Sequence, residues 1–243
     1  MWKPEQEDSS NQVWTEDSLP VLRMSISLPQ PLGESRTARR IRRYYRAQGR
    51  AFRRYCEGFL LPRARESGRE ALRDSRPPDC WEACLEWHLT CGDQGLWSLY
   101  TQSREVPGRG TPFLVRRGDV WDLNTGYPTP LSAFFPPHWR WGLLRTLEDL
   151  CGRQEAAGVS LWRQDWRRQF RRCFNARNFY LTPDGLVVFY PMYTLGDASE
   201  GIPVFSFPYG PEGPFLRPEG FAPTPEQTAV WQKFCQTAAQ EHP

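Results

Sequence analysis

Hydrophobic and polar positions follow two different periods in the first third of the chain. Every second residue between positions 22 and 28 is apolar, which predicts a half-buried strand that ends at Pro29. Over residues 35–61 the apolar positions recur at three- and four-residue steps with arginines between them. That period predicts one amphipathic helix. Pro62 should end or kink it, and residues 63–75 should add a short polar helical extension.

The middle of the chain returns to a period of two. Residues 80–91 alternate, with one face made of Trp81, Ala83, Leu85, Trp87, Leu89 and Cys91. This pattern predicts a strand. A Gly-rich turn follows, and residues 96–103 are the expected return strand. Two more short strands are expected at 113–115 and 120–123, on either side of Arg117 and Gly118, which completes an antiparallel meander.

Helical and strand patterns both occur in the last third. Apolar spacing predicts helices over residues 141–151 and 162–174, a hairpin over 178–190 and a strand over 202–209. A capping sequence before residues 225–241 predicts a terminal helix. Strands and helices do not alternate one for one. The expected fold class is therefore α+β, with a largely antiparallel β-sheet packed against helices.

Composition limits the class of protein. The 243 residues include 11 Trp, 14 Phe and 9 Tyr, enough large side chains for an ordered core. The longest apolar run, residues 186–190, is far shorter than the roughly 20 residues that span a bilayer. The first residues are acidic and do not have the basic start of a secretory signal. We therefore expect no membrane insertion and a cytoplasmic location.

Four residues have the chemistry of a zinc site: Cys80, Cys84, His88 and Cys91. On the predicted strand Cys91 faces away from His88, and Cys84 and His88 lie about 13 Å apart at roughly 3.3 Å per residue. One zinc ion with bonds of about 2.0–2.3 Å cannot join them. We expect no metal, no cofactor and no disulfide framework, and we expect the cysteines to be reduced thiols on apolar faces.

Nucleophilic catalysis needs a base beside the nucleophile, and the chain offers three histidines, His88, His138 and His242. His242 is one residue from the end of the sequence, and His88 is expected on the polar face of a strand. The sequence contains no Gly-x-Ser-x-Gly elbow, phosphate-binding loop or His-Glu-x-x-His helix. We assign no catalytic residue and expect the protein not to be an enzyme.

Arginines are concentrated in one region. The net charge is only +3, but residues 36–76 contain 14 arginines against four acids. The exposed side of helix 36–61 would present Arg39, Arg43, Arg46 and Arg50, which makes them candidate nucleic-acid contacts. The other interpretation is a solvated face, because the aromatic residues of this helix occupy its apolar, core-facing positions. Both interpretations stay open from the sequence.

Several motifs in the last third resemble a known family. They are the run FNARNFYLTPDGLVVFY at residues 174–190, Tyr193, and GIPVFSFPY at 201–209. Together they resemble the C-terminal domain shared by RsiV-type anti-sigma factors and PdaC-type peptidoglycan deacetylases. VWDLNTG at 120–126 and LSAFF at 131–135 are similar to the companion N-terminal part of that unit. The resemblance covers roughly residues 20–210.

The resemblance implies an α+β unit in which two sequence halves fold together as a sensing or binding module without catalytic residues. On this basis we expect four parts. They are a flexible acidic leader (1–18), an N-terminal half (19–136), an RsiV-like C-terminal half (137–210), and a linker with a terminal helix (211–243). No transmembrane, sigma-binding or deacetylase segment is found in the sequence, so we expect a stand-alone version of the module.

The expected function is non-enzymatic binding or sensing, with a protein as partner. Candidate contacts lie in loops between rigid elements, where sequence can vary without disturbing the core. They are Tyr193 and Asp197 in the segment 191–201, and Arg109 in the loop 106–111. Both loops could also be ordinary connections. Nucleic-acid binding through helix 36–61 and an accessory role in cell-wall carbohydrate chemistry are the alternatives.

Overall fold

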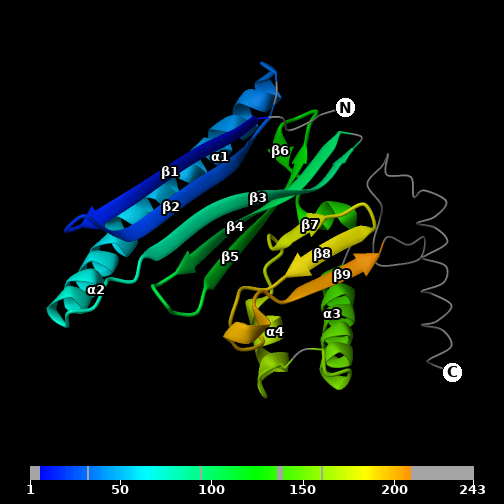
Figure 1. The fold of residues 1–243 in the computed structure, drawn as a ribbon. Coiled ribbons are helices and arrows are strands. Elements are labelled where there is room, and N and C mark those ends of the chain that lie inside the picture. Colours follow the sequence, from blue (N-terminus) through cyan, green and yellow to red (C-terminus); the bar gives the residue numbers. More distant parts are fainter. Residues whose placement is uncertain (1–5, 32, 94, 136–138, 160, 209–243) are drawn as a thin grey trace.

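Two β-sheets and four α-helices form the framework of the protein in a computed structural model, which describes residues 6–31, 33–93, 95–135, 139–159 and 161–208 (Figure 1). The strands are β1 Gln6–Glu16, β2 Leu19–Gln30, β3 Trp81–Asp93, β4 Leu96–Val106, β5 Phe113–Asp122, β6 Tyr127–Pro128, β7 Phe179–Leu181, β8 Gly185–Phe189 and β9 Val204–Pro208. The helices are α1 Arg36–Tyr55, α2 Leu61–Arg73, α3 Trp139–Ala156 and α4 Trp166–Cys173. None of the helices in these ranges combines the length and apolarity needed to cross a bilayer.

The larger sheet has six strands in chain order, β1 to β6, and the smaller has three, β7 to β9. Neighbouring strands are antiparallel everywhere except between β2 and β3, which are parallel. A parallel pair needs a long crossover, and α1 and α2 provide it. The expected α+β class with a largely antiparallel sheet is confirmed.

Residues 6–16 are not a flexible leader, and that prediction is wrong for them. They form β1, which pairs with β2 along its whole length through a tight turn at Asp17 and Ser18. Glu16 lies within 3.5 Å of the Arg65 guanidinium and 2.7 Å of that of Arg69, both on α2. The sequence of β1 is too polar to show the alternation that predicts a strand. Its contacts with β2 and α2 hold it in place.

Pro62 does not end the helix that carries the arginines. A π-helical turn, Cys56–Leu60, joins α1 to α2, and the Leu61 N–H donates to the Cys56 carbonyl. Pro62 then lies in the first turn of α2, where its missing N–H costs little. The helical segment therefore continues through the proline to Arg73, and the predicted helical extension over residues 63–75 is present as α2.

Two details of the meander differ from the predictions. The expected short strands 113–115 and 120–123 are one strand, β5, because Arg117 and Gly118 pair with Thr101 and Tyr100 of β4. In β3 the register shifts between Leu89 and Cys91. This bulge moves Cys91 to the face opposite Leu85, so the predicted common face of the two residues is wrong.

The two faces of the larger sheet bury separate cores. On one face, α1 and α2 cover β2, β3 and β4, with Leu22, Met24, Ile41 and Leu99 among the buried residues. The other core joins the end of the larger sheet to β7–β9, α3 and α4. Its buried aromatic members include Phe134, Trp166, Phe170, Phe179, Tyr190, Phe205 and Phe207. Each core is therefore formed by the apolar sides of helices and strands that are distant in the sequence.

Backbone of β7 lies directly against β4 and β5 where the sheets meet. The Ser98 hydroxyl accepts a hydrogen bond from the Leu181 N–H at 2.7 Å and donates to the Leu181 carbonyl at 3.1 Å. A Cβ at Gly118 would overlap the Phe179 carbonyl. The junction therefore requires a glycine on β5 and uses a hydroxyl on β4.

The predicted terminal helix 225–241 and the linker before it lie outside the described residues. The proposed boundary between the sequence halves at residues 136 and 137 likewise stays a prediction.

We expect Gly118→Ala to destabilise the fold by about 3 kcal/mol, near the upper end of overpacking costs, because its methyl group meets backbone that cannot rotate away. The matched control is Gly142→Ala on the exposed side of α3, where a Cβ meets nothing within 4 Å. The control should stabilise by up to about 1 kcal/mol, because alanine favours helix. Urea unfolding measures both. Equal stability of the two variants would contradict the close packing of β7 on β5.

Candidate binding surfaces

The segment 191–201 contacts the start of β5 through two residues. The Tyr193 ring stacks on Phe113, with ring centroids 6.1 Å apart and an interplanar angle of 14°. The Met192 sulfur accepts a hydrogen bond from the Leu114 N–H at 3.3 Å. Met192 is buried, whereas the exposed fractions of Tyr193 and Phe113 are 38% and 41%. Met192 therefore attaches the segment, and the two rings remain open to solvent.

Val115 extends this exposed apolar area. It lies two residues after Phe113 on the same side of β5, and its exposed fraction is 49%. We call Phe113, Val115 and Tyr193 the aromatic surface. It combines residues that are about 80 positions apart in the sequence. Of these three residues only Tyr193 was predicted as a contact. Phe113 and Val115 were not, because the sequence of a strand does not show which of its apolar side chains remain exposed in the fold.

Tyr193 has a left-handed backbone, with φ of +66°. Residues other than glycine, asparagine and aspartate rarely adopt this backbone conformation. Holding an aromatic residue in it costs about 1–3 kcal/mol of folding free energy. Its conformation is held by the Met192 contact before it and by the Thr194 N–H, which donates to the Pro191 carbonyl at 3.1 Å. The structure keeps a strained tyrosine whose ring is more than a third exposed.

The other two predicted partner contacts form ion pairs elsewhere. Asp197 accepts from the Arg163 guanidinium at 3.0 and 3.1 Å. Arg109 donates to Asp79 at 3.0 Å, and its side chain is 85% exposed. Within the described ranges, no polar contact joins Arg109 to Tyr193 or Asp197. Exposed pairs of this kind contribute little to stability. The structure thus links Tyr193 to Phe113 and not to the other predicted residues.

Arginines form a continuous row along the exposed side of α1. Arg39, Arg43, Arg46 and Arg50, the predicted nucleic-acid contacts, are all exposed on this side. The row is extended at its two ends by Arg36 and Arg54, which are exposed as well. We call these six residues the arginine stripe. At about 100° per residue they fall within an arc of roughly 80°.

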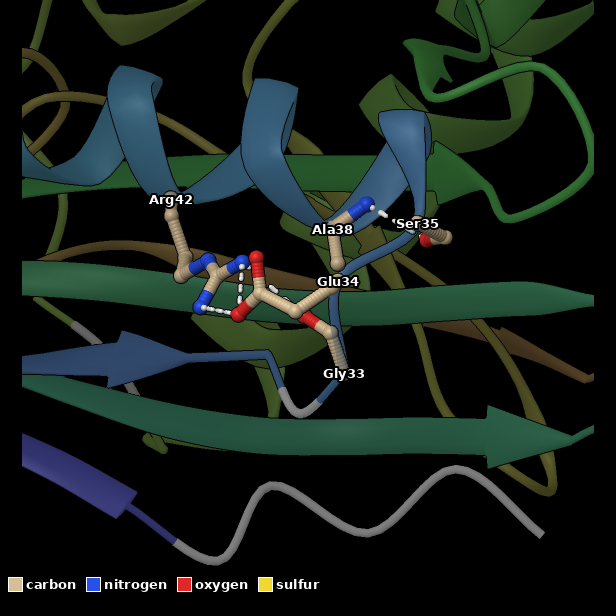
Figure 2. A network of polar contacts seen from close by, with 5 residues as sticks. All are labelled: Gly33, Glu34, Ser35, Ala38 and Arg42. Atoms are coloured by element: carbon tan, nitrogen blue, oxygen red, sulfur yellow. Dashed lines mark hydrogen bonds and ion pairs between the residues drawn. The ribbon is translucent and has the colours of Figure 1, made fainter.

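The remaining arginines of α1 have partners near the helix ends. Figure 2 shows Arg42, which donates to the Glu34 carboxylate at 3.2 Å and to the Gly33 carbonyl at 2.9 Å. The Ser35 hydroxyl beside them caps the helix by accepting from the Ala38 N–H at 3.0 Å. Arg40 donates to the Thr125 carbonyl, and Arg53 to the Ser10 hydroxyl.

A buried carboxylate connects α1 to the sheet beneath it. Asp119 of β5 accepts hydrogen bonds from Tyr44 at 2.7 Å and Tyr45 at 3.2 Å, and Trp121 donates to the Tyr45 oxygen at 2.8 Å. The Arg117 guanidinium lies 3.6 Å from the same carboxylate. Desolvation raises the pKa of Asp119, while the hydrogen bonds from the tyrosines and the charge of Arg117 act in the opposite direction.

The chemistry of this cluster is structural. Burial and the nearby Asp119 raise the pKa values of Tyr44 and Tyr45, so both phenols stay protonated as hydrogen-bond donors.

Burial also raises the pKa of the Cys56 and Cys151 thiols to about 12, which removes the thiolate needed for nucleophilic attack.

His88 lies on the exposed face of β3. It is 3.2 Å from Glu86 and stacks on Tyr100 with ring centroids 4.7 Å apart. Within the described residues, no three histidine, cysteine or acidic side chains gather in a way that could hold a metal ion. His138 and His242 lie outside the described part of the chain.

Comparison with known proteins assigns the fold. Residues 154–210 match the model of a family described as a protein of unknown function, DUF3298. A member of the DUF3298 family from Bacteroides fragilis is 15% identical, with 84% of this chain and 89% of that chain covered and a TM-score of 0.51. A DUF3298 family protein from Pseudomonas aeruginosa is 14% identical, with 91% and 99% covered and a TM-score of 0.53. The chain shares the fold of these two proteins.

Curated proteins gave no match. The family match starts in the last residues of α3 and ends after β9, so it includes Tyr193 and the small sheet. The larger sheet, α1 and the arginine stripe lie before it.

The Asp119 cluster generates a pH prediction. The carboxyl has a pKa raised above its unfolded value, so its contribution to stability is full below pH 3.8 and is lost as the pH rises through the folded-state value. Asp119→Asn cannot ionise. We expect the stability of this variant relative to the wild type to increase as the pH rises from 4 to 7.5. Urea unfolding at several pH values measures the difference, and a constant or falling difference would contradict the buried carboxylate.

Proposed function

We propose that the chain is a non-enzymatic binding and sensing module of the RsiV-like type, and that it binds a protein through the aromatic surface. The observation that carries this proposal is the exposed stack of Tyr193 on Phe113. Tyrosine and phenylalanine are enriched in protein interfaces, because a rigid ring offers a large contact area at a small cost in conformational entropy.

The strained backbone of Tyr193 supports the same assignment. Folding stability alone would favour a glycine or asparagine at a left-handed position. An exposed tyrosine that persists there holds its ring in one direction at a cost in free energy. Rigid presentation of an aromatic ring is what a binding surface needs, because less entropy is then lost on association.

The resemblance to the RsiV-like domain adds to this argument. Tyr193 follows the run 174–190 and precedes the run 201–209, the two stretches that carry the resemblance. In the fold these stretches provide β7, β8 and β9. Tyr193 therefore projects from a loop that a rigid three-stranded sheet supports. Loops held by rigid scaffolds are common places for binding residues.

The test is a double variant, Phe113→Ser with Tyr193→Asn, used for affinity capture from a lysate of the organism that encodes the chain. Asparagine tolerates the left-handed backbone, so this variant should fold with a melting temperature close to that of the wild type. We expect a protein retained by the wild type to be retained at least tenfold less by the variant. Quantitative mass spectrometry of the captured proteins measures the ratio, and purified partner then gives the dissociation constants.

The matched control is Trp141→Ser, which removes an exposed aromatic side chain from α3, where the exposed fraction is 76%. We expect this control to retain the partner as well as the wild type does. Loss of the partner from the control, with full retention by the double variant, would place the interface on α3 and overturn the proposal.

A further inference from the structure

We infer that the arginine stripe of α1 binds the phosphate backbone of duplex nucleic acid without reading its sequence. This goes beyond the proposed protein binding and uses a different surface. The stripe consists of Arg36, Arg39, Arg43, Arg46, Arg50 and Arg54.

The length and straightness of the stripe come first. Arg36 and Arg54 are 18 residues apart, which corresponds to about 27 Å along a helix that rises 1.5 Å per residue. Successive members are three or four residues apart, so neighbouring guanidinium groups follow one another on consecutive turns. A straight row of cations of this length can contact several phosphates of one duplex at once.

The charges of the stripe are not neutralised within the described ranges. Among the side chains that the structure describes, no member of the stripe has an acidic partner within 4.0 Å, and the sequence of α1 contains no acidic residue. Several other arginines are paired instead: Arg42, Arg163 and Arg171 each hold a carboxylate within about 3.2 Å. Six like charges on one side of a helix repel one another. A row of anions laid along them relieves that repulsion.

Phosphate is the anion that this geometry fits. A guanidinium group donates two parallel hydrogen bonds to a phosphate, and a duplex carries one negative charge per roughly 1.7 Å of its axis. The covalent backbone of each nucleic-acid strand already holds its phosphate charges in a row. An acidic protein would instead have to order a matching row of carboxylates on long side chains.

The other side of α1 argues against a membrane. Ala38, Ile41, Tyr45 and Gly49 are buried under the sheet core, roughly opposite the stripe. Helices that bind in a lipid interface insert an apolar face, and this helix has its apolar face occupied. The same packing places Tyr44, Tyr45 and Phe52 of α1 against the core and away from a duplex bound along the stripe. Contacts from the stripe therefore go to backbone phosphates, which position a protein without specifying sequence.

The experiment compares purified full-length wild type with Arg39→Gln/Arg43→Gln/Arg46→Gln/Arg50→Gln. Binding to a fluorescent 20-base-pair DNA duplex is measured by anisotropy between about 30 and 200 mM salt. If six arginines contact phosphates, the logarithm of the affinity falls with the logarithm of the salt concentration with a slope of about −5. Removal of four contacts should reduce the slope to about −2, and a duplex of scrambled sequence should bind equally well.

Three further variants make the result decisive. The matched control, Arg145→Gln/Arg153→Gln/Arg168→Gln/Arg172→Gln, removes four exposed arginines from α3 and α4 and lowers the net charge equally, so its slope should match the wild type. Arg39→Lys/Arg43→Lys/Arg46→Lys/Arg50→Lys should preserve the slope, because the charges remain. Phe113→Ser/Tyr193→Asn should bind the duplex normally, which separates this inference from the proposed protein binding.

Three results would overturn the inference. They are undetectable binding of the duplex at about 30 mM salt, an equal loss of binding in the matched control, and stripe-dependent binding to vesicles of anionic phospholipid without binding to the duplex. Circular dichroism and melting temperatures confirm that each variant is folded.

Discussion

Backbone contact between β7 and the pair β4–β5 is the constraint on which the arrangement of the protein depends. Ser98 bridges both the N–H and the carbonyl of Leu181, and Gly118 leaves room for the Phe179 carbonyl. Because this contact fixes the smaller sheet on the larger one, it also places the segment that follows β8 beside β5, where Met192 contacts Leu114. The stack of Tyr193 on Phe113 is a consequence, since neither segment alone would bring the two rings together.

The larger sheet gives its two faces different roles. One face binds α1 through a buried core and through the Asp119 cluster, so the helix cannot rotate about its axis without breaking both. That fixed orientation is why the arginines of the stripe point to solvent together. The other face carries the smaller sheet, and the segment after β8 brings Tyr193 against Phe113 at the start of β5. The two proposed binding surfaces therefore lie on elements that the same sheet holds, and they use different chemistry: apolar contact on one and charge on the other.

Periodicity predicted most elements because it records which side of each element is buried. It identified α1, β2, β3 and the hairpin β7–β8. It missed β1, whose polar side chains carry little signal, and it placed Cys91 on the wrong face because a bulge inserts one residue without changing the local pattern. The stripe positions Arg39 to Arg50 could be predicted, since exposure follows from helical spacing. Phe113 could not, because its role depends on contact with Tyr193, about 80 residues later.

Hydrogen–deuterium exchange on the full chain, with and without the protein that it captures, tests the central claim most directly. The claim is that the aromatic surface, formed where the two sheets meet, is the protein-binding site. The account predicts slower exchange of backbone amides over residues 113–117 and 192–196 in the complex, with little change in α3. Protection confined to α3 or α4, with unchanged exchange at those two segments, would contradict it.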